Sequence, residues 1–267
     1  MQCFKNGKAV AQIDLHDRAF HYGDGCFSTA RMIDGQIELQ ARHIARLEQA
    51  CQALQLRANL VSLPMSLAHL PRATGTLKII ISRGVGQRGY SLPEQEADVW
   101  LFFYPKEQVL PFEPESIHSD VLKLRLGQTM PALVGIKSLN RLEQVMLKAE
   151  ADSRQLPEAI VLDQQSEIVE GVSSNCFLKL NNTWVTPELR YNGVQGVMRA
   201  EILARMQQQG IACEVRSVHQ DELQQLQSLF FCNALSAMKM VTQFADHALD
   251  VASCQTLFAQ LQLNRIA

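Results

Sequence analysis

The sequence predicts a mixed α/β protein in two halves. Short β-branched and apolar runs bounded by turn residues indicate strands, and longer stretches with apolar residues at three- and four-residue steps indicate helices. Segment 105–115 contains three prolines and is typical of a linker. The 267 residues are enough for one large domain or two smaller ones. We predict domains at 1–107 and 118–267, joined by a linker at 108–117.

The N-terminal half begins as a meander of short strands. Turn dipeptides at 6–7 (Asn-Gly) and 34–35 (Asp-Gly) separate apolar runs that we expect to be strands, at 3–4, 10–13, 26–33 and 36–39. From 41 to 56 the apolar period becomes helical, with one stripe formed by Ile44, Leu47, Cys51 and Leu54. Further strands are predicted at 76–82 and 99–104, with a glycine-rich loop at 83–90 between them.

The C-terminal half alternates strands with helices. Its strands are expected at 119–126, 159–163, 168–170, 176–180, 183–186, 213–216 and 229–232. One helix is predicted to start at Lys137, because apolar residues recur at helical spacing at Ile136, Leu139, Leu142, Met146 and Ala149. A second helix is expected from about 194 to 208, and a short one at 221–226.

Composition points to a small-molecule partner. The formal net charge is −2 and no Lys/Arg run stands out, which disfavours nucleic acid as a partner. No apolar run approaches the roughly 20 residues that a membrane span requires, and the N-terminus lacks the apolar core of a signal peptide. We therefore expect a cytoplasmic protein that binds no membrane. The seven scattered cysteines show no metal-ligand spacing, so we expect reduced thiols and no metal site.

Lys137 is the first candidate for chemistry. At the start of a helix and among apolar neighbours, a lysine feels both desolvation and the positive end of the helix dipole, which disfavour its ammonium form. A neutral amine is the form that attacks a carbonyl carbon. The alternative is an ordinary exposed lysine near a helix start.

Four motifs resemble a known family. Segments 135–142 (GIKSLNRL) and 170–175 (EGVSSN) resemble the signature of the fold-type-IV pyridoxal-phosphate enzymes, which include D-amino-acid transaminase, branched-chain transaminase and aminodeoxychorismate lyase. Segments 20–31 (FHYGDGCFSTAR) and 81–90 (ISRGVGQRGY) resemble the lyase members most closely. The similarity covers nearly the whole chain and is weakest after about Val241.

The resemblance implies an architecture and a cofactor. It implies a smaller N-terminal α/β domain and a larger C-terminal domain that has a β-barrel-like core and binds pyridoxal 5'-phosphate. It also implies a homodimer, because in D-amino-acid transaminase the loop that matches 83–90 reaches across the dimer interface.

The resemblance assigns cofactor contacts. Lys137 supplies the amine for the cofactor aldehyde, Glu170 pairs with the ring nitrogen, and Arg46 in the His-Ile-Ala-Arg-Leu motif binds the phosphate. The phosphate cradle is the helix start after residue 195, where free amides favour an anion, together with a second loop; its residues are Gly196, Val197, Met198, Asn233 and Ala234. By sequence alone, Arg46 and Glu170 are equally surface residues, and the cradle consists of ordinary strand-to-helix corners.

Substrate contacts depart from the transaminase pattern. Arg88 matches an arginine of the transaminase carboxylate trap, the set of side chains that binds the substrate carboxylate. Tyr90 replaces a histidine of that trap, and Phe27 replaces a tyrosine. These departures favour the lyase. We expect Arg88 and Tyr90 to contact substrate, with Arg83 as a weaker candidate. Asn140, one helical turn beyond Lys137, is expected to orient polar groups near it, although a surface asparagine is an equal alternative.

The implied reaction converts 4-amino-4-deoxychorismate to 4-aminobenzoate and pyruvate in folate synthesis, with Lys137 as general base. The alternatives are a D-amino-acid or branched-chain transaminase that uses the same groups, and a pyridoxal-phosphate-binding protein without turnover.

Overall fold

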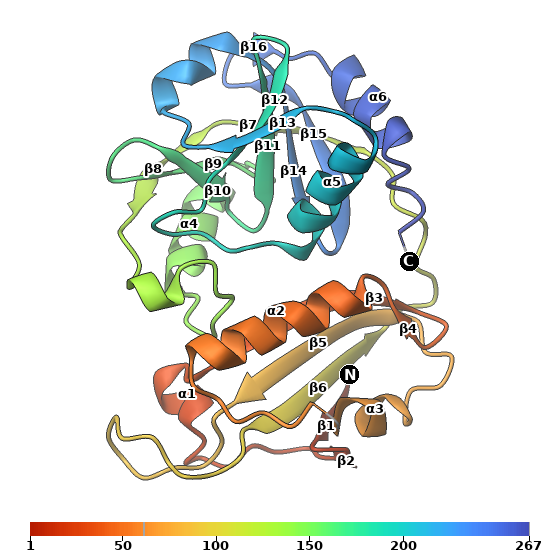
Figure 1. Ribbon diagram of the computed structural model, residues 1–267, viewed down its shortest axis with the longest axis vertical. Coiled ribbons are helices and arrows are strands. Elements are labelled where there is room, and N and C mark those ends of the chain that lie inside the picture. Colours follow the sequence, from red (N-terminus) through yellow and green to blue (C-terminus); the bar gives the residue numbers. More distant parts are fainter. Residues whose placement is uncertain (61, 267) are drawn as a thin grey trace. The chain divides into compact units, whose positions relative to one another are not determined.

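The computed structural model describes residues 1–60 and 62–266, and it confirms the mixed α/β fold (Figure 1). The chain forms two compact units. Unit 1 comprises Met1–Leu110 and a short insertion, Ile136–Asn140, and unit 2 comprises Pro111–Gly135 and Arg141–Ile266. The five residues 136–140 therefore belong to one unit while the chain on either side belongs to the other.

Unit 1 is built on a six-stranded antiparallel sheet with the order β2-β1-β6-β5-β3-β4. Its strands are β1 (Gln2–Lys5), β2 (Lys8–Ala9), β3 (Gly25–Ile33), β4 (Gln36–Ile37), β5 (Gly75–Ser82) and β6 (Asp98–Pro105). Its helices are α1 (Arg18–Tyr22), α2 (Gln40–Ala53) and α3 (Ser62–Leu67). The turns predicted at 6–7 and 34–35 are confirmed, because they join β1 to β2 and β3 to β4. The strand expected at 10–13 is wrong, because the strand that pairs with β1 ends at Ala9.

Helix α2 packs on β3 and closes the core of unit 1 (Figure 1). Leu47 and Cys51 of the predicted stripe are buried, and Ile44 and Leu54 pack against the core. His43, one position before Ile44, is also buried. The helical period was therefore predicted correctly. The buried face of α2 is wider than the predicted apolar stripe, because it also includes the polar side chain of His43.

Unit 2 contains two sheets. One has three strands in the order β10-β9-β8, and the other has seven, in which β13-β12-β11-β14-β15-β16 form a path and β7 pairs with β15. The strands are β7 (Glu115–Ser119), β8 (Val121–Leu126), β9 (Ile160–Asp163), β10 (Ile168–Gly171), β11 (Asn175–Leu180), β12 (Thr183–Pro187), β13 (Cys213–Arg216), β14 (Leu226–Asn233), β15 (Ser236–Phe244) and β16 (His247–Ala248). The helices are η1 (Pro131–Leu133), α4 (Leu142–Ser153), α5 (Val197–Gln208), η2 (Gln220–Gln225) and α6 (Ala252–Gln260).

The β-barrel-like core expected for the second half is not closed, because the pairings among the described residues leave two separate sheets. The chain passes from one sheet to the other between β10 and β11. There the Gly171 N–H donates to Ser174 O at 2.6 Å, so the chain turns sharply. A Cβ at Gly171 would lie 2.7 Å from the Phe231 ring, which explains why this corner uses glycine.

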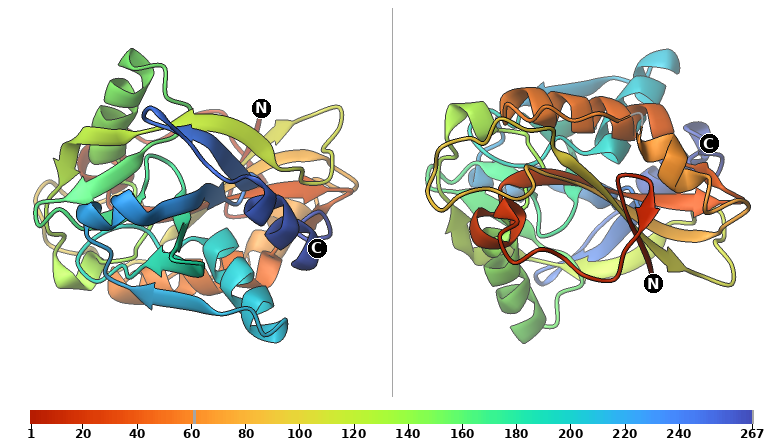
Figure 2. Two further views of the ribbon diagram at one scale, coloured as in Figure 1. Left: turned by 90° about the horizontal axis from the view of Figure 1, so that it is seen from above. Right: turned by 90° about the horizontal axis from the view of Figure 1, so that it is seen from below.

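Aromatic residues of the seven-stranded sheet pack against one another. Phe177 and Phe230 stack at 4.9 Å between ring centroids, and Trp184 meets Phe230 edge-on at 5.5 Å. Helices α5 and α6 pack on β14 (Figure 2). The strand β7 starts at Glu115, inside the segment expected to be a linker.

Candidate active site

Lys137 lies in an extended segment that pairs with the start of β3. The Phe27 N–H donates to Lys137 O at 3.0 Å, and the Leu139 N–H donates to Gly25 O at 2.9 Å. Ser138 forms the bridge position opposite Cys26. Because these are main-chain bonds, they hold the backbone of Lys137 in place whatever its side chain does.

Two lysine side chains approach the Phe27 ring. Lys137 Nζ and Lys78 Nζ are each 4.8 Å from its centroid, within the range of cation–π attraction. Sequence reasoning missed Lys78. The signal that could have identified it is a lysine in the middle of β5, whose other central residues are apolar.

The prediction that a helix starts at Lys137 is wrong. Helix α4 begins at Leu142, so Lys137 precedes it by five residues and does not feel its dipole as a first-turn residue. Leu142 and Met146 are 74% and 53% exposed, and the buried residues of α4 are Leu147 and Ala151. The apolar spacing combined an extended segment that packs in unit 1 with a helix that packs in unit 2, and periodicity alone does not separate the two.

The expected position of Asn140 on a helix face with Lys137 is therefore also wrong. The Asn140 Nδ2 donates to Gly23 O at 3.2 Å, and Asn140 Oδ1 occupies the space 2.5 Å from where a Cβ of Gly23 would lie. Gly23 has a positive φ of 61° at the end of α1. Asn140 thus anchors the Gly-Asp-Gly corner that leads into β3.

Arg46 is a half-buried cation. Its Nη2 donates to Ser28 Oγ at 2.5 Å, and Ser28 Oγ lies 2.6 Å from His43 Nδ1. Burial lowers the pKa of Arg46 to about 10. Its Nε is buried without a hydrogen-bond partner in the described part of the chain. An orphaned guanidinium donor fits an anionic oxygen, so this site can accept the phosphate of the implied cofactor.

Glu170 lies on β10 and is buried. Its Oε2 accepts from the Val194 N–H at 3.0 Å and from Asn175 Nδ2 at 3.2 Å. Asn175 Nδ2 also donates to Val194 O at 2.9 Å. The carboxylate is thus held in one orientation by two donors, as a partner for a protonated ring nitrogen requires.

The N-terminus of α5 is open to an anion. Gly196 is its N-cap and no side chain caps the helix, so the first-turn amides of Val197 and Met198 have no capping partner. A Cβ at Gly196 would lie 2.0 Å from Asn175 Oδ1, so only glycine fits beside the residue that orients Glu170. These features fit the phosphate cradle implied by the sequence.

Asn233 closes the turn between β14 and β15. Its Oδ1 accepts from the N–H groups of Leu235 and Ser236, at 2.9 and 3.0 Å, and its Nδ2 donates to Ser173 O and Ser174 Oγ. The side-chain oxygen and nitrogen of Asn233 both form hydrogen bonds within unit 2. Asn233 and Ala234 can therefore contribute to a phosphate site through the shape of this turn, and not through the side-chain amide of Asn233.

Arg88 and Tyr90 lie in the exposed loop after β5. Arg18 Nη1 donates to Gly89 O at 2.8 Å, and the Gly89 N–H donates to Tyr22 Oη at 3.0 Å. Tyr90 itself is 86% exposed. The loop is therefore held at Gly89 while the two flanking side chains point to its surface.

Arg83 is bonded to other residues of unit 1. Its Nε pairs with Asp24 at 2.8 Å, and its two terminal nitrogens donate to Gln55 O and Leu54 O. The neighbouring Arg18 shares the same Asp24 oxygen, and the two arginines lower the pKa of Asp24 against the opposing effect of burial. Arg83 thus ties the Gly-Asp-Gly corner to the end of α2.

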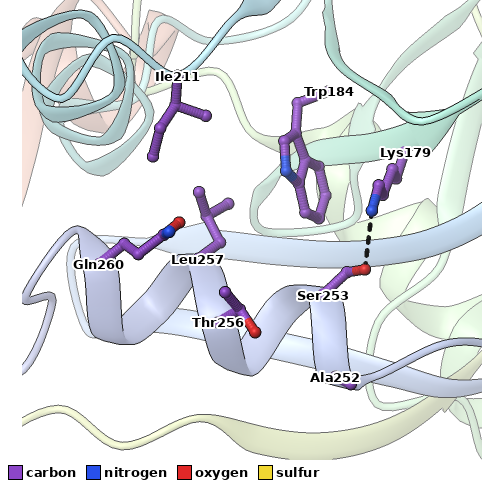
Figure 3. Close-up of a pocket in the computed structure, with 8 residues that line it drawn as sticks. All are labelled: Lys179, Trp184, Ile211, Ala252, Ser253, Thr256, Leu257 and Gln260. Carbon is purple, nitrogen blue, oxygen red and sulfur yellow. Dashed lines mark hydrogen bonds between the residues drawn. The ribbon is translucent and has the colours of Figure 1, made fainter.

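A separate pocket of about 310 Å³ lies within unit 2 (Figure 3). Trp184, Ile211 and Leu257 supply its apolar lining, and Lys179 Nζ hydrogen bonds to Ser253 Oγ at 2.9 Å across it. It contains none of the predicted site residues. Within the described ranges, no three His, Cys, Asp or Glu side chains form a metal site. No helix in residues 1–60 and 62–266 is long and apolar enough to span a membrane.

Comparison with known proteins places these features in a class. The fold is similar to that of a solved 4-amino-4-deoxychorismate lyase from Pseudomonas aeruginosa, with a TM-score of 0.87 at 34% identity and with 97% of this chain and 98% of that chain covered. The model of the amino-transferase class IV family matches residues 25–244. The chain belongs to this family.

Two curated relatives give the range of activities among similar chains. An aminodeoxychorismate lyase from Vibrio harveyi is 34% identical over 244 residues, covering 89% of each chain. A D-alanine aminotransferase from Bacillus licheniformis is 26% identical over 257 residues, covering 91% of this chain and 88% of its own. The fold-type-IV membership predicted from the motifs is confirmed, and with it the pyridoxal-phosphate dependence of the family.

Proposed function

We propose that this protein is a pyridoxal-phosphate-dependent lyase that converts 4-amino-4-deoxychorismate to 4-aminobenzoate and pyruvate in folate synthesis. The observation that carries the proposal is Lys137, held by main-chain bonds against β3 with its amine over the Phe27 ring. A phenyl ring at this position lacks the hydroxyl that the transaminase carboxylate trap uses. The 34% identical relatives named as lyases support the same choice.

The cofactor contacts divide among three groups of residues. Lys137 supplies the amine for the cofactor aldehyde, and Glu170 keeps the ring nitrogen protonated. Arg46 and the first turn of α5, at Gly196, Val197 and Met198, bind the phosphate, and the Asn233–Ala234 turn shapes the cradle. When bound, pyridoxal phosphate supplies an electron sink for the negative charge that develops at carbon beside the substrate amine.

Proton transfer is assigned to Lys137. Its Nζ removes the proton from C4 of the substrate ring and returns a proton to the departing enolpyruvate, which leaves from C3. Aromatisation of the ring then drives the step forward. Arg88 binds a substrate carboxylate from the exposed loop, with Tyr90 beside it. Asn140 contributes indirectly, because it holds Gly23 at the start of the corner before β3.

The test is release of 4-aminobenzoate from enzymatically generated aminodeoxychorismate by the cofactor-loaded protein. Lys137→Ala is expected to lose both the absorption band of the bound cofactor and turnover, while it keeps its fold because the pairing with β3 uses backbone atoms. Lys148→Ala, an exposed lysine of α4 paired with Asp152, is the matched control. Substantial lyase turnover in Lys137→Ala would exclude the proposed role.

Transaminase activity is the second candidate, because Arg88 of the transaminase trap is present and a D-alanine aminotransferase is 26% identical. In that case an amino-acid donor alone would convert the bound cofactor to its amine form. Absence of 4-aminobenzoate release combined with this conversion would favour the transaminase.

We also propose a cytoplasmic homodimer. Several large apolar side chains are exposed, which is typical of an interface. In unit 1 they lie on α1 and the 83–93 loop, at Phe20, Val85, Tyr90 and Leu92, and in unit 2 they lie on α4, at Leu142, Val145 and Met146.

A further inference from the structure

Glu158 is a fully buried carboxylate that the proposed cofactor contacts do not include. It is 0% exposed and lies two residues before β9. No lysine, arginine or histidine in residues 1–60 and 62–266 forms an ion pair with it. A buried ion without a charged partner is costly unless it is well hydrogen bonded. The hydrogen bonds of Glu158 therefore indicate which part of the chain depends on it.

Both carboxylate oxygens of Glu158 are bonded to one residue, Ser173. The Ser173 N–H donates to Glu158 Oε1 at 2.9 Å, and Ser173 Oγ donates to Glu158 Oε2 at 3.3 Å. The pairing of β9 with β10 explains this contact. Ile160 lies opposite Gly171, and the same register places Glu158 opposite Ser173. The carboxylate thus continues the ladder beyond the ends of the two strands, where it takes the place of a main-chain carbonyl as the acceptor.

Ser173 is the exposed residue of the turn between β10 and β11. The Gly171 N–H donates to Ser174 O at 2.6 Å across this turn. On the other side of the turn, Asn233 Nδ2 donates to Ser173 O at 3.3 Å and to Ser174 Oγ at 3.1 Å. The main-chain N–H of Ser173 is therefore held by Glu158, and its carbonyl is held by Asn233 of the proposed phosphate cradle.

This turn separates the two members of the hydrogen bond between Glu170 and Asn175. Glu170 is the residue before the turn and Asn175 is the residue after it, and Asn175 Nδ2 donates to Glu170 Oε2 at 3.2 Å. Because only residues 171–174 join the two, a shift of the turn moves one partner relative to the other. A hydrogen bond weakens steeply as its geometry departs from the optimum, so such a shift would release Glu170 from its orientation.

We propose that Glu158 is a positioning residue, which fixes the turn at 171–174 and thereby orients Glu170 toward the nitrogen of the cofactor ring. This inference rests on the role of Glu170 in the proposed function. Since Glu158 is fully buried, it acts through Ser173 and not by contact with a ligand. An ionised carboxylate suits this task, because its two oxygens accept from the N–H and from the hydroxyl of Ser173 at the same time.

The test compares two ligands that differ at one ring atom. Pyridoxal 5'-phosphate carries the ring nitrogen, and its 1-deaza analogue has a C–H group in that place, so only the first ligand can pair with Glu170. In titrations of the wild-type apoprotein, pyridoxal phosphate is expected to bind on the order of 10- to 100-fold more tightly than the analogue. Glu158→Met keeps the length of the side chain and removes both acceptors. It is expected to reduce this affinity ratio roughly 3- to 10-fold, and to lower kcat more than it raises KM.

Three further variants serve as controls. Glu158→Gln keeps one acceptor for the Ser173 N–H and is expected to recover most of the affinity ratio, which also covers the case in which Glu158→Met folds poorly. Asp163→Ala removes another buried carboxylate, which accepts two main-chain N–H groups at 2.9 Å at the opposite end of β9 and β10. It is expected to lower the free energy of unfolding without changing the ratio. Glu170→Ala is expected to remove the preference for pyridoxal phosphate.

The same affinity ratio in Glu158→Met, Glu158→Gln and wild type would overturn the inference, even if both affinities fall together, because Glu158 would then support the fold alone. A wild-type ratio that persists in Glu170→Ala would also overturn it, because Glu170 would not be the partner of the ring nitrogen. The ratio is measured without turnover, so it decides the role of Glu158 whether or not the lyase assay releases 4-aminobenzoate.

Discussion

At the scale of single residues, Arg46 is connected to His43 through one hydroxyl group. Arg46 is a donor only, so Ser28 Oγ accepts from it at 2.5 Å. The only acceptor near the Ser28 hydroxyl hydrogen in the described part of the chain is His43 Nδ1, at 2.6 Å. The direction of the chain is therefore Arg46 to Ser28 to His43, which requires a neutral His43 with its proton on Nε2. Ser28 and His43 thus position the arginine assigned to the cofactor phosphate.

Ser28→Ala is expected to weaken binding of pyridoxal phosphate roughly 5- to 20-fold, because Arg46 loses the bond that orients it. Binding of pyridoxal, which lacks the phosphate, should not change. Ser66→Ala, at another buried serine of unit 1, is the matched control for packing. Apoprotein titrations with the two ligands would check this, and an equal loss for both would indicate a general structural defect instead.

His43 makes stability depend on pH. Burial, followed by the positive charge of Arg46, lowers its pKa from 6.5 to about 3. Between these values the unfolded chain binds a proton that the folded chain does not, so the free energy of unfolding falls as the pH is lowered through this window. The slope attributable to one such group is at most about 1.4 kcal/mol per pH unit.

His43→Gln is therefore expected to show a shallower dependence of unfolding free energy on pH below 6.5, although its stability at neutral pH is lower. Denaturant unfolding at several pH values measures the slope. Exposed His247→Gln on β16 serves as the comparison, and an identical slope in wild type and His43→Gln would contradict the assignment.

At the scale of secondary-structure elements, β10 and the start of α5 form one hydrogen-bonded group. Glu170 is held by Val194 and Asn175, and Asn175 Oδ1 lies where a side chain at Gly196 would have to go. A change at the helix N-cap therefore acts on the carboxylate as well as on the phosphate cradle.

Gly196→Ala is expected to weaken pyridoxal-phosphate binding by about tenfold or more, because a Cβ only 2.0 Å from Asn175 Oδ1 must displace that side chain. It should also shift the absorption of the bound cofactor, since Glu170 loses a donor. Gly127→Ala is the matched control, because nothing lies within 4 Å of a Cβ there. Unchanged affinity and absorption in Gly196→Ala would argue against this coupling.

The elements themselves were predictable to different degrees. Helix α2 and the turns at 6–7 and 34–35 follow from local apolar periodicity and turn dipeptides, and they were predicted correctly, whereas the strand expected at 10–13 is replaced by β2 at Lys8–Ala9. Helix α1 was missed because its five residues are too few to show a period, although Asp17 caps it by accepting from the Ala19 N–H at 2.8 Å. The start of α4 was misplaced because Ile136 and Leu139 belong to unit 1, although their spacing continues the apolar period of the helix.

At the scale of the whole molecule, the exposed apolar residues of α4 lead to a prediction about assembly. Val145 is 60% exposed between Leu142 and Met146, so a charge there would have to be buried in an interface that uses this face. Val145→Glu is expected to raise the dimer dissociation constant by at least roughly 100-fold.

Light scattering coupled to size-exclusion chromatography over a dilution series measures this constant. Lys148→Ala on the same helix should not alter it, because that side chain pairs with Asp152 at 2.6 Å. A wild-type protein that is monomeric at concentrations where it is active would contradict both the homodimer and the proposed role of the exposed loop.

The sequence by itself determined the family, the mixed α/β class and the residues proposed to bind the cofactor, because these can be recognised from residue type and local motifs. Lys137, Glu170 and the glycine before α5 stand in motifs that can be recognised without coordinates. What each group contacts in the folded chain was decided by tertiary structure.

Only the fold pairs 136–140 with β3, joins Arg46 to Ser28 by a hydrogen bond, and brings Lys78 to the same aromatic ring as Lys137. These contacts join residues that are distant along the chain, and neither helical nor strand periodicity carries information about such pairs. Burial then gives them their chemical properties, because a charge that would be ordinary in water must find a partner or a ligand once solvent is removed.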